Sequence, residues 1–537
     1  MATQTDTELE ILAPFAASTL HHPLLIINGS LRTPTPAGSD QNETTLANTS
    51  PITLPKGRFI MVIAELSGIQ ITSSFTNGLL TVALPAMAAD LALEPNLLVW
   101  ASSVYFLTSG ACLLMAGAVS DVLSPRAINL VGCLLLACFM LASGLARTGI
   151  ELIMFRAMQG IASALVMPSS MSIVSTSVEN GRPRNIGFAC VGMSQPLGFS
   201  FGLVLGGLFV KTVGWRYGYH IAGALGFALF VVGIWVLPRV VVDQTQAPKL
   251  KRLASEIDWV GAALASSSIA TFSYVLAELS ANINNIHAAS NIALLCTSIA
   301  LIPGFVSWMR NQERRNKPAL IPNKIWSNMA FSCVCVMVLL ANAVANCMEL
   351  FSSLFFQEVQ GTTALGASLR MLPNLLVGAG VNVVTGVLVD KIPATYAVLG
   401  GSTLNIGAPL LMALINPRWP YWYDAFFAQI LSGISCDVLF TVGLLIVSAS
   451  FPAHTQGLAG AVFNTVTQLG ASIGLTVLSV ISTTVTDDSA IVDKSSPGAL
   501  FEGYKAGFWT LVGMMGAAVV VGGIGLRELG KVGEKRD

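Results

Sequence analysis

Long apolar runs separated by short polar stretches occupy the chain from about residue 58 onward. Fourteen runs each approach the ~20 residues that an α-helix needs to cross the hydrocarbon core of a bilayer. Because helices satisfy their own backbone hydrogen bonds in lipid, the pattern predicts an all-α polytopic membrane protein with fourteen transmembrane helices. The expected spans are residues 59–85, 97–118, 127–146, 151–174, 186–210, 217–237, 259–279, 288–308, 328–352, 364–388, 394–414, 421–448, 457–483 and 505–527.

The composition supports the membrane assignment. Of 537 residues, 53% are hydrophobic and 10% are charged, and the mean hydropathy is +0.70. A soluble protein carries about 25% charged residues. The formal net charge is zero, which gives no reason to expect nucleic acid as a partner. The lipid bilayer is the expected surrounding.

The distribution of Lys and Arg predicts the orientation. If the N-terminus is cytoplasmic, 20 basic residues lie on the inner side of the predicted spans and 6 lie on the outer side. The other two, Arg156 and Arg370, lie in or beside spans. Since short cytoplasmic loops are enriched in Lys and Arg, both termini are expected in the cytoplasm.

An internal repeat predicts the domain organisation. The second span closes with Gly117-Ala-Val-Ser-Asp121, and the tenth closes with Gly386-Val-Leu-Val-Asp390-Lys391. Two related halves with two helices inserted between them would give this spacing. The polar, Thr/Ser/Asn/Pro-rich start of the chain predicts a disordered tail. The expected units are a cytoplasmic tail at 1–57, a six-helix half at 58–238, a linker with two inserted helices at 239–326, a second six-helix half at 327–528 and a short cytoplasmic tail at 529–537.

Two of the apolar runs carry unusual polar and glycine residues. The run from Leu152 to Gly160 contains Arg156, and Gln159 lies three residues later on the same helical face. An arginine inside a span costs about 2.5–3.5 kcal/mol on insertion scales and commonly marks a functional site. The other run contains Gly198, Gly202, Gly206 and Gly207, and glycines four residues apart let another helix approach closely.

These two runs resemble motifs of the major facilitator superfamily of transporters. Leu152 to Gly160 is similar to the helix 4 motif, and Gly198 to Gly207 is similar to the helix 5 antiporter motif. The chain most resembles the fourteen-helix drug:proton antiporter branch, of the fungal multidrug and aminotriazole-resistance type. One position departs, because Leu203 stands where that motif usually has proline, and Pro196 lies earlier in the run.

The resemblance implies a fold and a function. The expected protein has two six-helix halves that rock around a midplane cavity, and it works as a monomer. Its expected activity is export of drug-like or secondary-metabolite molecules by proton antiport with alternating access. A proton-coupled amino-acid or siderophore transporter of the same fold is an alternative, as is a non-transporting membrane sensor. The plasma membrane is the expected location, with the vacuolar membrane as the alternative.

The resemblance also extends to two loops, one after the second predicted span and one after the tenth. The family pattern there contains a Gly, an Asp and several basic residues, of which Gly117, Asp121 and Arg126 remain in the first half. Asp121 is expected either to form a gating ion pair or to be an interfacial residue at a helix end. The second copy comprises Gly386, Asp390 and Lys391.

The sequence shows no enzymatic or ATP-binding constellation. It contains no Gly-x4-Gly-Lys-Ser/Thr motif, so ATP is not expected to supply the energy directly. The five histidines do not form a metal-ligand pattern, and neither a metal nor a cofactor is expected. A transporter of this kind therefore has to use an ion gradient or the gradient of its cargo.

Proton coupling requires a protonatable group within the helix bundle. Asp437 is the deepest carboxylate in a predicted span, while Glu349 and Glu65 lie nearer the ends of theirs. Each could instead be a hydrogen-bonded structural group. Antiporters of the family often carry an Asp in helix 1, where Thr76 stands in this chain.

Polar amides within the spans suggest a cargo site. Uncharged amides mixed with Met and Phe suit a sizeable amphipathic organic molecule. For any single amide, a hydrogen bond between helices is an equally good interpretation. The expected substrate and proton pathway contains Arg156, Gln159, Asp437, Glu349, Glu65, Asn77, Gln195 and Asn346.

Overall fold

The structure is a computed structural model that describes residues 55–93, 95–98, 100–177, 182–238, 257–281, 287–315, 317, 319–321, 323–388, 393–450 and 453–526. These ranges contain fourteen helices of 21 residues or more, which confirms the all-helical prediction. The predicted tails lie outside the described residues, apart from 55–57. The domain boundaries given above stay predictions.

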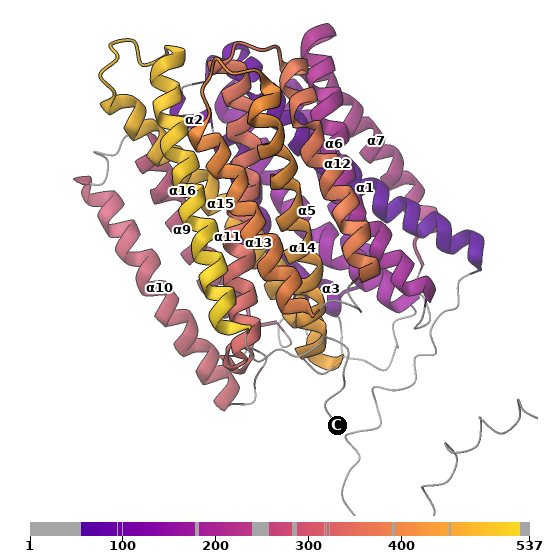
Figure 1. Cartoon of the computed structure of the whole chain (residues 1–537). Coiled ribbons are helices and arrows are strands. Elements are labelled where there is room, and N and C mark those ends of the chain that lie inside the picture. Colours follow the sequence, from indigo (N-terminus) through magenta and orange to yellow (C-terminus); the bar gives the residue numbers. More distant parts are fainter. Residues whose placement is uncertain are drawn as a thin grey trace, which may run out of the picture. The chain divides into compact units, whose positions relative to one another are not determined.

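The long helices follow the predicted spans in order (Figure 1). They are α1 (Lys56–Asp90), α3 (Trp100–Val122), α4 (Pro125–Leu145), α5 (Gly149–Ser177), α6 (Arg182–Thr212), α7 (Trp215–Val236), α9 (Trp259–Ala281), α10 (Ala289–Arg314), α11 (Met329–Leu354), α12 (Ala364–Leu388), α13 (Ala394–Leu414), α14 (Ala425–Ser450), α15 (Ala453–Asp488) and α16 (Pro497–Gly525). The short elements are α2 (Pro95–Leu98), the 3-10 turns η2 (Asn323–Ser327) and η4 (Tyr421–Tyr423), and the π-helical turn η3 (Phe355–Val359).

Over the described residues, eleven of these helices are long and apolar enough to cross a membrane. In α9 and α14 the apolar stretches found are shorter, covering Trp259–Phe272 and Ala425–Ile434. Most of the long helices therefore meet the length and apolarity that a membrane span needs.

Several helix ends, in α1, α3, α6, α10, α14, α15 and α16, differ from the sequence-based boundaries by four residues or more. Those of α1 and α16 involve a proline. Helix α1 continues through Pro85 to Asp90, since proline removes one backbone hydrogen bond without having to end a helix. Helix α16 begins at Pro497, eight residues before the predicted start at 505. The Ser496 side chain accepts a hydrogen bond from the Ala499 N–H, and proline suits the first helical position.

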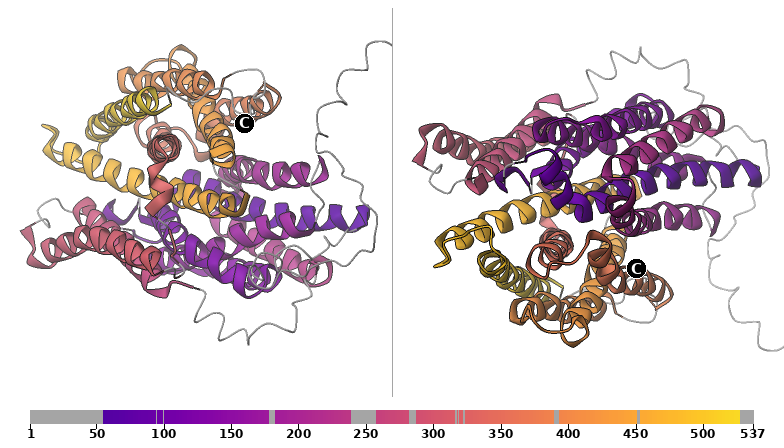
Figure 2. Two further views of the ribbon diagram at one scale, coloured as in Figure 1. Left: turned by 90° about the horizontal axis from the view of Figure 1, so that it is seen from below. Right: turned by 90° about the horizontal axis from the view of Figure 1, so that it is seen from above.

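The helices form two groups of six. Within the first, α1 packs on α6 and α7, and α5 packs on α3 and α4. Within the second, α11 packs on α15 and α16, and α14 packs on α12 and α13. In Figure 2 the indigo-to-magenta helices gather on one side and the orange-to-yellow helices on the other. We call these groups the N-terminal and C-terminal halves.

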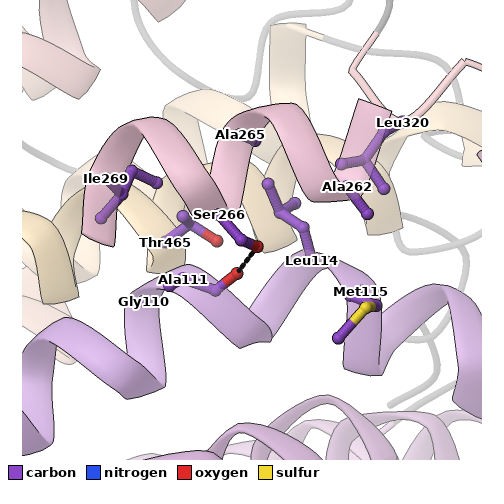
Figure 3. A pocket seen from close by; sticks show the side chains of 10 residues that line it. All are labelled: Gly110, Ala111, Leu114, Met115, Ala262, Ala265, Ser266, Ile269, Leu320 and Thr465. Carbon is purple, nitrogen blue, oxygen red and sulfur yellow. Dashed lines mark hydrogen bonds between the residues drawn. The ribbon is translucent and has the colours of Figure 1, made fainter. Parts of the chain in front are cut away.

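The two inserted helices lie at the seam between the halves. Helix α9 packs against α3 of one half and α15 of the other, and the Ser266 hydroxyl donates to the Ala111 carbonyl at 2.8 Å (Figure 3). Helix α10 packs mainly on α9 and exposes apolar side chains, including Ile299 and Ile302. Exposed apolar residues on a membrane helix suit contact with lipid tails.

The halves meet along α3 and α15 and along α6 and α12. Two hydrogen bonds between the halves lie toward the ends that the basic residues assign to the outside. The Ser368 hydroxyl of α12 donates to the Leu203 carbonyl of α6 at 2.7 Å. The Gln357 amide of η3 donates to the Val82 carbonyl of α1 at 3.1 Å. These bonds hold the outer ends of the N-terminal and C-terminal halves together.

Candidate functional site

Arg156 on α5 lies inside the N-terminal half with no solvent exposure. Its Nη2 donates to Asn77 Oδ1 at 2.5 Å, its Nη1 to Gln159 Oε1 at 3.0 Å, and its Nε to the Ala101 carbonyl at 3.3 Å. The guanidinium carbon also lies 4.7 Å from the centre of the Tyr105 ring. Arg156 therefore joins α5 to α1 and α3.

These partners of Arg156 are neutral. Burying a cation costs several kcal/mol unless other groups compensate its charge. Here amide and carbonyl oxygens take three of the five N–H donors, and the face of Tyr105 adds a cation–π contact. The site thus holds a positive charge through dipoles rather than through a carboxylate.

Polar bonds around Arg156 extend across four helices. Gln159 Nε2 donates to the Ser143 hydroxyl at 2.7 Å and to the Phe139 carbonyl at 3.0 Å, which ties α5 to α4. The Tyr105 hydroxyl lies 2.9 Å from the Ser73 hydroxyl of α1 and donates to the Ser163 hydroxyl at 2.9 Å. We refer to Arg156, Gln159, Asn77, Tyr105, Ser73, Ser143 and Ser163 as the Arg156 network.

Asn77, and not Thr76, is the helix 1 residue that faces Arg156. Thr76 is buried and donates its hydroxyl to the Ser73 carbonyl of its own helix at 2.7 Å. Asn77 is half-buried and uses its side-chain oxygen for Arg156. Adjacent helical residues point about 100° apart, so of these two neighbours only Asn77 presents its side chain to Arg156.

Glycines bring α6 into backbone contact with α1. A methyl group at Gly198 would overlap the Ile71 carbonyl oxygen, and one at Gly202 would overlap that of Phe75. At Gly206 a methyl group would lie 3.0 Å from Leu79 Cα. The neighbouring Gly207 faces the other half, where a methyl group would meet Ser368.

Two further glycines make close helix contacts that the sequence motifs did not predict. Gly78 of α1 faces the backbone of α6, where a methyl group would overlap the Phe199 carbonyl oxygen. Gly160 of α5 faces α3, where a methyl group would overlap the Tyr105 carbonyl oxygen. A glycine beside a polar residue within a span, as in Asn77-Gly78 and Gln159-Gly160, was the available signal.

Of the candidate proton carriers whose side chains the structure describes, neither Glu65 nor Glu349 is a hydrogen-bond partner of Arg156. Glu65 is 1% exposed between α1, α4 and α7, and the Cys133 thiol lies 3.9 Å from its Oε1. Its Oε2 makes no hydrogen bond in the described chain. Glu349 is half-buried on α11. Asp437 lies within α14, but its side chain is outside the described residues.

The remaining predicted residues are scattered among the helices. Gln195 is half-buried on α6, and Asn346 donates to the Asn342 carbonyl of its own helix at 3.0 Å. A methyl group at Gly117 would lie 3.8 Å from Pro168. Arg126 donates to the Ile234 carbonyl at 2.5 Å. The side chain of Asp121 and residues Asp390 and Lys391 lie outside the described part of the chain, and Gly386 lies within α12.

The pocket between α3, α9 and α15 is too small for an organic cargo. Its volume is about 10 Å³, and Figure 3 shows Gly110, Ala111, Ser266 and Thr465 among its lining residues. Cavities that hold drug-sized molecules have volumes of roughly 300–1,000 Å³. In the described ranges, His, Cys, Asp and Glu form no group of three or more that could hold a metal ion.

The profile of the Major Facilitator Superfamily matches residues 66–475. The chain belongs to the major facilitator superfamily. As a member of this superfamily, it is a multi-pass membrane transporter of small molecules and not an enzyme.

Several transporters resemble this superfamily member over most of their length. It is 39% identical to MFS-type transporter 1 of Pyricularia oryzae, with 89% of this chain and 85% of the relative covered. It is 25% identical to the low affinity ammonium transporter of Saccharomyces cerevisiae, covering 79% of each. It is also 25% identical to the efflux pump terG of Aspergillus terreus, covering 80% and 79%.

The fold resembles a solved structure in the superfamily. A bacterial homologue of the human lysosomal transporter Spinster, crystallised in an inward-facing and occupied conformation, superposes with a TM-score of 0.62. The match covers 88% of this chain and 98% of that chain at 14% identity. At this identity the likeness shows the major facilitator fold alone.

Proposed function

We propose that this transporter exports drug-like or secondary-metabolite organic molecules from the cytoplasm in exchange for protons. The observation that carries the proposal is the glycine face of α6 against α1 at Gly198, Gly202 and Gly206. These glycines form the run that resembles the helix 5 motif of the drug:proton antiporter branch. The efflux pump terG, a 25% identical relative, supports export as the direction.

The contacts between the halves support a carrier that alternates its access. Ser368 bonds to Leu203 and Gln357 bonds to Val82 near the ends assigned to the outside. With the outer ends joined, we propose that cargo enters from the cytoplasmic side in this state. Separation of the same contacts would then release the cargo outside the cell. We further propose that the protein acts as a monomer at the plasma membrane.

The Arg156 network is proposed to orient cargo and to keep the N-terminal half rigid. An amide does not titrate in the physiological range, so Asn77 carries no coupled proton. We therefore propose that a carboxyl elsewhere in the bundle carries it. Asp437 is the first candidate because of its depth in the α14 sequence, and Glu65 is the second because it is 1% exposed.

Expression in a host that lacks its own multidrug exporters tests the export proposal. Cells producing the protein should retain less of at least one amphipathic compound from a chemically varied panel than cells producing Arg156→Ala. A protonophore should abolish that difference. Equal retention of every compound in both strains would contradict export.

Proteoliposomes test the coupling proposal with a compound that the panel identifies. Asp437→Asn should abolish accumulation driven by an imposed pH gradient while leaving exchange of labelled for unlabelled compound intact. Glu65→Gln, measured in parallel, separates the two carboxyls. If Asp437→Asn still accumulates the compound uphill, Asp437 does not carry the proton.

Transport of ammonium is the second candidate function. It is favoured by the 25% identity to the low affinity ammonium transporter of Saccharomyces cerevisiae. Uptake of radiolabelled methylammonium, an ammonium analogue, distinguishes the two proposals. Raised methylammonium uptake without any change in drug retention would favour this candidate over export.

A further inference from the structure

A basic pocket lies where the ends of α1, α4 and α7 meet, outside the Arg156 network. Its volume is about 430 Å³. Arg58 of α1 and Arg126 of α4 line it together with Ile234, Trp235 and Leu237 at the end of α7. Among the described residues that line the pocket, two are arginines and none is acidic.

The end of α7 positions both arginines. Arg58 Nε donates to the Val236 carbonyl at 3.3 Å, and Arg126 Nη2 donates to the Ile234 carbonyl at 2.5 Å. The last carbonyls of a helix lack partners within that helix, so they are natural acceptors for these guanidinium groups. A guanidinium has five N–H donors in a planar fork that suits a phosphate group.

The pocket borders a surface suited to lipid. Trp235 is 79% exposed, and the large apolar side chains of Ile60 and Met61 are exposed on the neighbouring turn of α1. Tryptophan is enriched where a membrane meets water. The distribution of basic residues assigns these helix ends to the cytoplasmic side, where anionic lipids attract clusters of Lys and Arg.

We propose that the pocket formed by Arg58, Arg126 and Trp235 binds the phosphate-bearing headgroup of an anionic phospholipid of the cytoplasmic leaflet. The two guanidinium forks hold the headgroup, and the Trp235 ring packs beside the lipid at the interface. Because the arginines come from different helices, the bound lipid links the ends of α1, α4 and α7. This site is separate from the proposed cargo pathway and does not depend on which compound is transported.

Lipid titration of the purified full chain tests the proposal. Binding of phosphatidylserine is measured by native mass spectrometry, with phosphatidylcholine as the uncharged comparison. Each basic side chain near an anionic headgroup contributes about fivefold in affinity, so Arg58→Gln/Arg126→Gln should bind phosphatidylserine roughly 30-fold more weakly. Binding of phosphatidylcholine should not change.

A matched control removes the same charge elsewhere. Arg310 and Arg314 are exposed at the end of α10, also on the predicted cytoplasmic side, and neither lines the pocket. Arg310→Gln/Arg314→Gln should bind phosphatidylserine like the unaltered protein. Equal weakening in both double variants, or none in Arg58→Gln/Arg126→Gln, would overturn the proposal.

Two further measurements keep the test decisive. Arg58→Lys/Arg126→Lys keeps both charges but loses the planar forks, so it should bind phosphatidylserine with intermediate affinity, even if the Gln variant does not fold. Wild-type affinity in the Lys variant would contradict headgroup recognition by the guanidinium forks. Excess inorganic phosphate should not displace the lipid. Displacement would show a free-anion site and overturn the assignment to a lipid.

Discussion

The guanidinium of Arg156 is compensated by several weak partners instead of one strong one. Three neutral oxygens and the Tyr105 ring surround a side chain that has no solvent exposure. Hydrogen bonds to a charged group contribute roughly 1.5–3 kcal/mol each, so their combined effect can offset the cost of burial. The geometry of the donors therefore matters as much as the charge itself.

Replacing Arg156 with lysine tests this dependence on geometry. Lys keeps the charge but presents its donors from a single nitrogen, so it cannot reach Ala101, Gln159 and Asn77 together. We expect Arg156→Lys to reach the membrane and to lower the transport rate at least tenfold, since losing one such bond costs about 1.5 kcal/mol or more. Arg147→Lys, at an exposed position, is the control and should transport normally. Normal transport by Arg156→Lys would show that transport requires only the positive charge at this position.

Asn77 offers a complementary substitution. Asn77→Asp places a carboxylate where an amide oxygen now accepts from Arg156 at 2.5 Å. Charge-assisted hydrogen bonds are roughly twice as strong as neutral ones, so Asn77→Asp should raise the free energy of unfolding by about 1 kcal/mol or more. The measurement is a higher unfolding temperature in detergent at neutral pH. Acidification that protonates the new carboxyl should remove this increase in unfolding temperature. Asn77→Leu, which leaves the guanidinium donor without an acceptor, should unfold at a lower temperature than the unaltered protein.

The sequence indicated which residues belong to this network, but not which of them bond to each other. Arg156, Gln159 and Asn77 stand out because they are polar within apolar runs. The pairing of Asn77 with Arg156 depends on how α1 is rotated against α5, and no local pattern fixes that rotation to within 100°. Tyr105 was missed because an aromatic residue in a span is as typical of packing as of a polar site.

Among the elements, α6 shows how glycine spacing becomes a helix contact. Residues four apart lie on one face, and Gly198, Gly202 and Gly206 bring that face against the backbone of α1. Gly78 of α1 faces back toward Phe199 and Leu203. Small residues on both helices permit an approach that any larger side chain would prevent.

Alanine substitutions along α6 test the closeness of this contact. Gly202→Ala would force the new methyl group against the Phe75 carbonyl, and overpacking typically costs about 1–3 kcal/mol. We expect a lower unfolding temperature and reduced transport. Gly192→Ala is the matched control on the same helix, because nothing lies within 4 Å of a methyl group there. Similar unfolding temperatures for the two variants would show that the helices are not in tight contact at Gly202.

The order of the helices follows from the apolar pattern, whereas some of their ends do not. Bilayer thickness sets the length of an apolar run, but a helix can extend beyond the bilayer through local capping. The early start of α16 depends on Ser496 and Pro497, a capping signal present in the sequence but outside the apolar run. The continuation of α1 beyond Pro85 has no comparable local signal.

On the scale of the whole molecule, the repeated Gly-x-x-x-Asp segments predicted two halves with two helices between them. Packing of α9 against both α3 and α15 now gives one inserted helix a position along the seam. The sequence could not predict which ends of the halves touch, because an alternating carrier adopts more than one arrangement of the same chain. That arrangement depends on contacts such as Ser368 with Leu203.

Two adjacent glycines of α6 face different neighbours, one within the N-terminal half and one in the C-terminal half. A side chain at Gly206 would meet Leu79 of α1, whereas one at Gly207 would meet Ser368 and Leu365 of α12. Gly206→Leu should therefore destabilise the N-terminal half and lower its unfolding temperature. Gly207→Leu should leave that half folded but oppose closure of the outer ends.

Distances between spin labels at Val213 and Thr363, which are exposed at the outer ends of different halves, report on this closure. Overpacking by about 1–3 kcal/mol shifts a two-state equilibrium by roughly 5- to 150-fold, so Gly207→Leu should move most molecules toward longer distances. Transport should fall, because the outer ends must close again in every cycle. Gly206→Leu should keep the distance distribution of the unaltered protein in the molecules that fold. Equal lengthening in both variants, or none in Gly207→Leu, would show that the contact of α6 with α12 does not control closure.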